Sequence, residues 1–119
     1  ALPPNASTVI ASFPAAKWTA REASMAFAEL AGNDRLIARN RLFTPLFREM
    51  KWPKARVSVR LEKGEAVFSS RTFAWGICLD LDGEALLPDN FFDVYPGRDV
   101  RLPWPGRRPP HIRFVGNLA

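Results

Sequence analysis

Two adjacent bulky aromatic residues, set between turn-forming residues in segment 89–97, constrain the fold of this chain most. The motif consists of Asp89, Asn90, Phe91, Phe92, Asp93, Pro96 and Gly97. Neighbouring side chains on an extended backbone point to opposite faces, so Phe91 and Phe92 can both enter one core only where the chain bends. The acid and amide before the pair favour a bend, and the Pro-Gly after it suits a type II turn. We therefore predict a short element between two reversals, with no catalytic pattern in it.

The second half of the chain has the two-residue periodicity of β-strands. In residues 56–62 the apolar side chains alternate with polar ones, which predicts that Val57, Val59 and Leu61 point inward. Lys63 and Gly64 then supply a turn, and residues 66–70 return as the next strand. A half-buried antiparallel pair is expected here.

Residues 73–81 are expected to form the longest strand. Its apolar face would consist of Phe73, Trp75, Ile77, Leu79 and Leu81. The other face carries only small residues, among them Cys78, so a second layer is expected to cover it. The single cysteine excludes an intrachain disulfide, and its place in an apolar strand predicts an inert, buried thiol.

The C-terminal part is expected to hold two more strands separated by a loop. Val100 and Leu102 alternate with a polar residue, and residues 111–118 would form a closing strand with Ile112 and Phe114 pointing inward. Between them, residues 103–110 contain four prolines, which lack the N–H donor that a central strand needs. We predict a loop there.

The first half supports two interpretations. Residues 20–31 are rich in Ala, Glu and Leu, and Gly32 follows as a C-cap, so local propensity favours a helix. The competing interpretation is a hairpin of residues 25–30 and 36–43 around a turn at 31–34, with Thr8, Ile10 and Ser12 in a neighbouring strand. Helix propensities differ by only a few tenths of a kcal/mol per residue and are readily overridden by packing. The residues alone leave both interpretations open.

Several segments together resemble the C-terminal immunoglobulin-like region of β-mannosidases of glycoside hydrolase family 2. The similar segments are residues 73–83, the aromatic motif at 89–93, Pro96-Gly97 and the closing strand at 111–118. Upstream, residues 37–43 resemble the strand that ends the preceding sandwich domain of these enzymes, and residues 45–53 resemble the connection into the last domain. This resemblance favours the hairpin over the helix for residues 25–43. The resemblance covers most of the chain, although only the aromatic motif is distinctive.

This resemblance implies an all-β chain, with an immunoglobulin-like antiparallel β-sandwich preceded by strands of an adjoining sandwich. Residues 1–44 would be the final strands of that preceding domain, 45–53 a linker and 54–119 the C-terminal domain. The first piece would expose an apolar face and unpaired edges, so it should pack on the second domain, pair with another copy or belong to a longer polypeptide. A single sandwich made by the whole chain is the structural alternative.

Charge and hydropathy limit the classes of partner. The net charge is +5, but the arginines are spread along the chain, with Arg107-Arg108 as the only compact pair, and no nucleic-acid motif accompanies them. We therefore expect no nucleic-acid partner, and an acidic neighbouring domain is another destination for the basic surface. No apolar run approaches the roughly 20 residues of a membrane span, so no membrane partner is expected either. Periplasmic, secreted and cytoplasmic locations all remain open.

Catalytic and metal-binding patterns are weak. The glutamates lie in expected turns or on outward strand faces, and in the enzymes that the chain resembles both catalytic glutamates lie in a separate barrel domain. His111 is the only histidine, which excludes a histidine-paired metal site. The acidic loop from Asp80 to Asn90 has no recognisable calcium spacing. We therefore predict no catalytic residue, no metal and no cofactor, and we expect this chain alone not to be an enzyme.

Carbohydrate binding is the alternative function, because sugar-binding sandwiches expose flat aromatic rings. Trp18 and Trp104 lie in expected loops and are the candidates, whereas Trp75 is expected in the core and Trp52 at the joint between domains. Our leading hypothesis is a non-catalytic accessory module that supports the catalytic barrel of a β-mannosidase-like parent. Its expected partners are the other domains of that parent, with mannose-containing glycans and a homodimer as further possibilities. The alternatives are a mannose-binding module and a basic protein-interaction adaptor.

Overall fold

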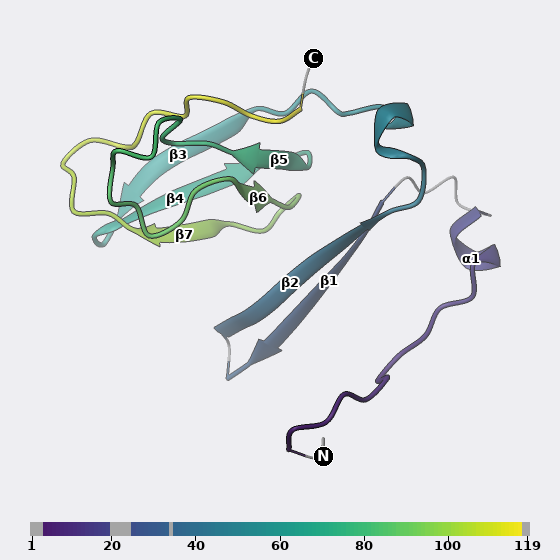
Figure 1. Ribbon diagram of the computed structural model, residues 1–119. Helices are drawn as coiled ribbons and strands as arrows, with labels where there is room; N and C mark the ends of the chain where they lie inside the picture. The colour runs from purple at the N-terminus through teal and green to yellow at the C-terminus, as the bar shows by residue number, and fades with distance from the viewer. Residues whose placement is uncertain (1–3, 20–24, 34, 118–119) are drawn as a thin grey trace. The chain divides into compact units, whose positions relative to one another are not determined.

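A computed structural model describes residues 4–19, 25–33 and 35–117 of the chain. It divides into two compact units, Ala1–Met50 and Lys51–Ala119, which we describe separately (Figure 1). The described residues form seven strands, all paired antiparallel, and only short helical turns. The chain is therefore all-β, as predicted. Within the described ranges no helix has the length and apolar character needed to cross a membrane.

The first unit contains a two-stranded hairpin of β1 (Met25–Gly32) and β2 (Arg35–Phe43), flanked by the short helix α1 (Ala16–Thr19) and the 3-10 turn η1 (Phe47–Glu49). The hairpin interpretation is confirmed for residues 25–32, whereas residues 20–24 lie outside the described part. Cross-strand pairing has overridden the helix propensity of this segment. The strand expected around Thr8, Ile10 and Ser12 is wrong, because residues 6–14 form no regular structure.

The two faces of the hairpin differ in chemistry. On one face Glu29 lies opposite Arg39 and forms an ion pair with it at 3.6 Å. On the other face, which we call the apolar hairpin face, Ala26 lies opposite Leu42 and Leu30 opposite Ala38, while Ala28 lies opposite the polar Asn40. The aliphatic residues of this face are Ala26, Ala28, Leu30, Ala38 and Leu42. Leu30 and Leu42, one on each strand, are 53% and 59% exposed.

The second unit consists of two small sheets. The first has the order β3-β4-β7, with β3 (Val57–Glu62), β4 (Glu65–Ser70) and β7 (Val100–Pro103), and the second pairs β5 (Ala74–Ile77) with β6 (Phe92–Val94). Side chains from both sheets form one buried cluster, in which the rings of Phe68 and Phe92 meet edge to face at 4.9 Å. The unit is therefore a two-layered β-sandwich with its core between the layers (Figure 1).

The β3 alternation behaves as predicted for two of its three apolar residues. Val57 and Val59 pack against the core cluster, and β3 pairs with β4 across the expected turn at Lys63 and Gly64. Leu61 lies on the same face, opposite the buried Ala66, but is still 36% exposed. It lies near the end of β3, which has a strand partner on one side only.

The strand expected over residues 73–81 is shorter and irregular. β5 ends at Ile77, and its pairing with β6 shifts register between Ala74 and Ile77, where Gly76 has a φ of 59°. This irregularity turns Ala74 and Ile77, three residues apart, into the same core. The expected apolar face is confirmed for Phe73, Ile77 and Leu79, which are buried, and is wrong for Leu81, which is 63% exposed. The regular alternation is also wrong, because Ala74 enters the same core.

The expected closing strand is also only partly present. Its described residues form a single bridge, in which the N–H groups of Cys78 and Arg113 donate to the carbonyls of Phe114 and Cys78 at 2.9 and 2.8 Å. Phe114 is exposed rather than inward, while Ile112 and Val115 pack against the core. Those two residues are three positions apart, so the backbone turns between them and cannot alternate as a strand. Leu118 lies outside the described residues, and the loop predicted after Pro103 is present.

Candidate functional site

The aromatic motif forms a sharp bend that exposes one of its two phenylalanines and buries the other. Phe91 has a φ of 58°, a left-handed conformation that is uncommon for a bulky residue, and it is 57% exposed. Phe92 is 9% exposed and enters the core. Beyond β6, the N–H of Arg98 donates to the carbonyl of Tyr95 at 3.0 Å, and Gly97 has a φ of 67°. The expected bend and type II turn are both present, but the bend expels one ring instead of burying two.

The polar side chains of this motif bind backbone of the neighbouring β5 segment. Asn90 Oδ1 accepts from the N–H of Leu79 at 2.9 Å, and Asn90 Nδ2 donates to the carbonyl of Asp80 at 2.7 Å. Asp93 Oδ1 accepts from the N–H of Gly76 at 3.0 Å, at the register shift of β5. These groups satisfy backbone atoms that the irregular ladder leaves unpaired. The motif therefore has a structural role: its side chains hold the segment around β6 against the backbone of residues 76–80.

The acidic loop that follows residue 79 also uses a carboxylate to bind backbone N–H groups. The two carboxylate oxygens of Asp80 accept from the N–H groups of Ala85 and Asp82 at 2.7 and 3.2 Å. The bond from Ala85, ahead of that from Asp82, holds the pKa of Asp80 below its ordinary value, because both stabilise the ionised form. Within the described residues, no group of acidic, histidine or cysteine side chains has the arrangement of a metal site.

Asn117 joins three segments of the second unit. Its Oδ1 accepts from the N–H of Trp75 at 2.7 Å, and its Nδ2 donates to the carbonyls of Pro53 and Phe73, both at 2.8 Å. The residue is 8% exposed, so water has little access to these bonds. One amide thus ties the entry of the unit, the start of β5 and the C-terminal segment together. Sequence reasoning missed it, because a lone asparagine near a chain end carries no pattern.

A stack of aromatic rings lies beside Asn117. Trp52 stacks on Trp75, with ring centroids 5.3 Å apart and an interplanar angle of 18°, and on Phe73 at 6.2 Å. Trp52 thus packs within the second unit. On this side Gly116 approaches the Trp75 ring, and its N–H donates to the Trp75 carbonyl at 2.6 Å.

We expect Gly116→Ala to destabilise the second unit by about 1–3 kcal/mol in urea unfolding, through overpacking. A Cβ at this position would lie 2.7 Å from Cζ3 and 2.8 Å from Cδ2 of Trp75, closer than real contacts allow. The matched control places the same substitution in a Trp75→Ala background, where the clashing ring is gone and the added cost should largely vanish. Equal costs in both backgrounds would show that crowding against Trp75 is not the cause.

The two candidate sugar-binding tryptophans lie in different parts of the chain. Trp18 lies in α1, and its side chain is outside the described part. Trp104 is half-buried, packs against the core, and its Nε1 donates to the carbonyl of Arg108 at 3.0 Å. The ring also closes against Gly106, where a Cβ would collide with it. The surroundings of Trp104 are those of a ring that seals the end of a sandwich.

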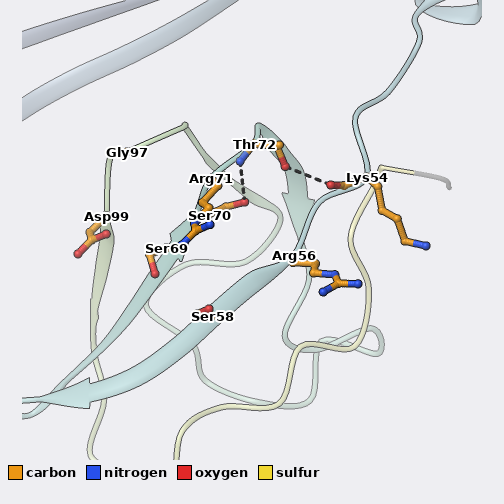
Figure 2. A pocket seen from close by; sticks show the side chains of 9 residues that line it. All are labelled: Lys54, Arg56, Ser58, Ser69, Ser70, Arg71, Thr72, Gly97 and Asp99. Atoms are coloured by element: carbon orange, nitrogen blue, oxygen red, sulfur yellow. Dashed lines mark hydrogen bonds between the residues drawn. The ribbon is translucent and has the colours of Figure 1, made fainter.

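An open pocket of about 700 Å³ lies on the second unit, at the end of the β3-β4-β7 sheet. Figure 2 shows its side chains coming from three segments: β3 with the residues before it, the end of β4 with the loop after it, and residues 97–99. The lining residues are Lys54, Arg56, Ser58, Ser69, Ser70, Arg71, Thr72, Gly97 and Asp99. Three cations and several hydroxyl groups thus surround one space, which we call the basic pocket.

The basic pocket was not predicted, because the arginines were judged as dispersed along the chain. The β3-β4 register shows why that judgement fails. Ser58 lies opposite Ser69, and the pairing ends at Val57 and Ser70, so Arg56 and Arg71 lie just beyond the same end of the two paired strands. The two-residue turn at Lys63 and Gly64 fixes this register locally, so pairing the strands around that turn was the signal that could have found the cluster.

Comparison with models of protein families, with curated proteins and with solved structures finds no match for this chain.

Proposed function

We propose that this chain is a non-catalytic β-sandwich accessory module, similar to the C-terminal region of a family 2 β-mannosidase, that packs against other domains of a longer polypeptide. The family assignment and its immunoglobulin-like fold come from the sequence resemblance. The observation that carries the accessory role is the exposure of Leu30 and Leu42 on the apolar hairpin face. Two strands alone make a marginally stable sheet, and an aliphatic face of this kind requires a partner surface.

The fate of the polar groups also supports a structural role. Asn90, Asp93 and Asn117 use their side chains to bind backbone, and Glu62 and Glu65 form ion pairs with Arg101 at 3.0 and 3.2 Å. A glycosidase needs two carboxyl groups facing each other across an open substrate site. In the parent that we propose, such a pair belongs to the barrel domain, and this module supports that barrel.

Sedimentation velocity of the purified chain tests the apolar hairpin face. We expect self-association that increases with concentration, because the face covers itself when its natural partner is missing, and Leu42→Lys should suppress it. Leu86→Lys is the matched control, since Leu86 is fully exposed on a loop of the second unit. A chain that stays monomeric at all concentrations, or equal behaviour of the two variants, would contradict the proposal.

Activity and glycan assays on the same samples separate the alternatives. We expect no turnover of a nitrophenyl β-mannoside and no binding on glycan arrays or to mannan. Turnover by the purified chain would overturn the non-catalytic assignment. Mannan binding that Trp104→Ala abolishes would favour the sugar-binding module instead. Binding to acidic proteins that weakens steeply with salt would favour the basic adaptor.

A further inference from the structure

The outer face of the β3-β4-β7 sheet is divided by charge. Toward one end, Arg101 forms ion pairs with Glu62 and Glu65, and Arg60 forms ion pairs with Asp99 at 2.9 Å and Glu62 at 3.6 Å. The bond to Glu65, followed by that to Glu62, raises the pKa of Arg101. These five residues form a continuous network, and the acids of this sheet face are all engaged in it.

The three cations at the other end have no such partners. Within the described residues, no carboxylate forms an ion pair with Lys54, Arg56 or Arg71. The only acid lining the basic pocket is Asp99, and its carboxylate faces Arg60. Lys54, Arg56 and Arg71 thus bring three like charges to one pocket, and a bound anion would offset the repulsion between them.

The walls of the basic pocket are fixed by hydrogen bonds. Thr72 Oγ1 donates to the carbonyl of Lys54 at 3.2 Å, and the N–H of Thr72 donates to Ser70 Oγ at 3.3 Å (Figure 2). The N–H of Gly97 donates to the carbonyl of Ser70 at 3.3 Å. The three segments that carry the lining residues are thus tied together, so a ligand does not have to order them on binding.

The lining chemistry defines the ligand class. Guanidinium groups bind phosphate and sulfate oxygens in a planar, two-pronged manner, and the Lys54 ammonium adds a further donor. The hydroxyl groups of Ser58 and Ser69 lie opposite each other and suit the hydroxyls of a polyol. The volume of about 700 Å³ exceeds what a bare anion fills and lies within the usual range of small-molecule pockets, roughly 300–1,000 Å³.

We propose that the basic pocket binds a phosphate or sulfate group, either as the free anion or as the ester of a small polar molecule such as a sugar. Arg56 holds the oxyanion from the residue before β3 and Arg71 from the residue after β4, and Lys54 approaches from the segment before β3. This site is independent of the accessory role proposed above, since it uses no residue of the first unit.

Calorimetric titration of the full 119-residue chain tests the proposal. The probes are inorganic phosphate, inorganic sulfate and glucose 6-phosphate, with glucose and an ionic-strength-matched chloride solution as blanks. We expect saturable one-to-one binding of at least one probe, with a dissociation constant of about 1 mM or lower. Tighter binding of the ester identifies an esterified ligand, and equal binding of phosphate identifies the free anion. Both results support the shared oxyanion chemistry.

Two variants and a matched control locate the site. Arg56→Gln and Arg71→Gln should each weaken binding by about 10- to 100-fold, because each removes charge-assisted hydrogen bonds to the oxyanion. Arg107→Gln removes the same charge from an exposed loop outside the basic pocket and should change nothing. Circular dichroism verifies that each variant is folded, and Arg56→Gln, which lies before β3, carries the test if Arg71→Gln unfolds.

Three results would overturn the proposal. The first is the absence of saturation by every probe at about ten times a millimolar dissociation constant. The second is an equal loss of affinity in Arg107→Gln and Arg56→Gln, which would mean diffuse attraction to a basic surface. The third is binding only to polyanions such as RNA or heparin, with a steep dependence on salt.

Discussion

Phe92→Ala is expected to lower the free energy of unfolding of the second unit by about 3–5 kcal/mol, the usual cost of removing a core phenylalanine. The Phe92 ring lies between the two sheets and meets Phe68 edge to face at 4.9 Å. Removing it opens a cavity at the place where the layers contact each other, and the short strand β6 has few other core residues to compensate. Urea unfolding followed by tryptophan fluorescence measures this loss.

The adjacent residue provides the matched control. Phe91→Ala removes the same ring one position earlier, but Phe91 is 57% exposed, so the change should stay within about 0.5 kcal/mol. Similar losses for the two variants would contradict the sorting of the rings by the bend. A larger loss for Phe91→Ala would mean that the motif faces the other way.

Asn117→Ala is the second substitution with a large expected effect, a loss of about 2–4 kcal/mol. The substitution removes the hydrogen bonds that Asn117 makes with the N–H of Trp75 and with the carbonyls of Pro53 and Phe73. Water is largely excluded from this region and cannot readily replace them. Leaving buried polar groups without partners costs more than a hydrogen bond contributes when it forms. The C-terminal segment should also detach first, which hydrogen exchange at the Gly116 amide would detect as faster exchange.

His111→Ala serves as the control for Asn117→Ala. It changes an exposed residue of the same C-terminal segment and should leave stability within about 0.5 kcal/mol of the original. If Asn117→Ala were equally mild, the amide would not be the tie that its three hydrogen bonds indicate. Asn117→Asp should also destabilise, because a carboxylate accepts from Trp75 but cannot donate to the two carbonyls.

Much of the fold could be predicted because its signals are local. The alternation in residues 56–62, the turn at Lys63-Gly64 and the type II turn at Pro96-Gly97 depend only on nearby residues, and each is present. Predictions failed where a distant segment decides the outcome. The strand at residues 73–81 was expected to alternate throughout, but Asp93 and Asn90 bind its backbone and the register shifts at Gly76.

The candidate sites could likewise be predicted only where local sequence decides them. Trp104 could be found from its setting between prolines, but its contacts with Gly106 and Arg108 arise from how the loop closes. The basic pocket combines residues before β3, after β4 and beyond the turn at Gly97. Charge counting along the chain treats these residues as scattered, since it carries no information about which strands are neighbours.

The all-β class, the turn at Lys63-Gly64 and the reversals on both sides of the aromatic pair could be predicted from the amino-acid sequence, because alternation and turn chemistry act between near neighbours. The burial of Phe92 rather than Phe91, the contacts of Asn117 with three segments and the gathering of three cations in one pocket became visible only in the folded chain. Those outcomes depend on strand register and on the packing of two layers, where residues far apart in the chain compete for the same hydrogen bonds and the same space.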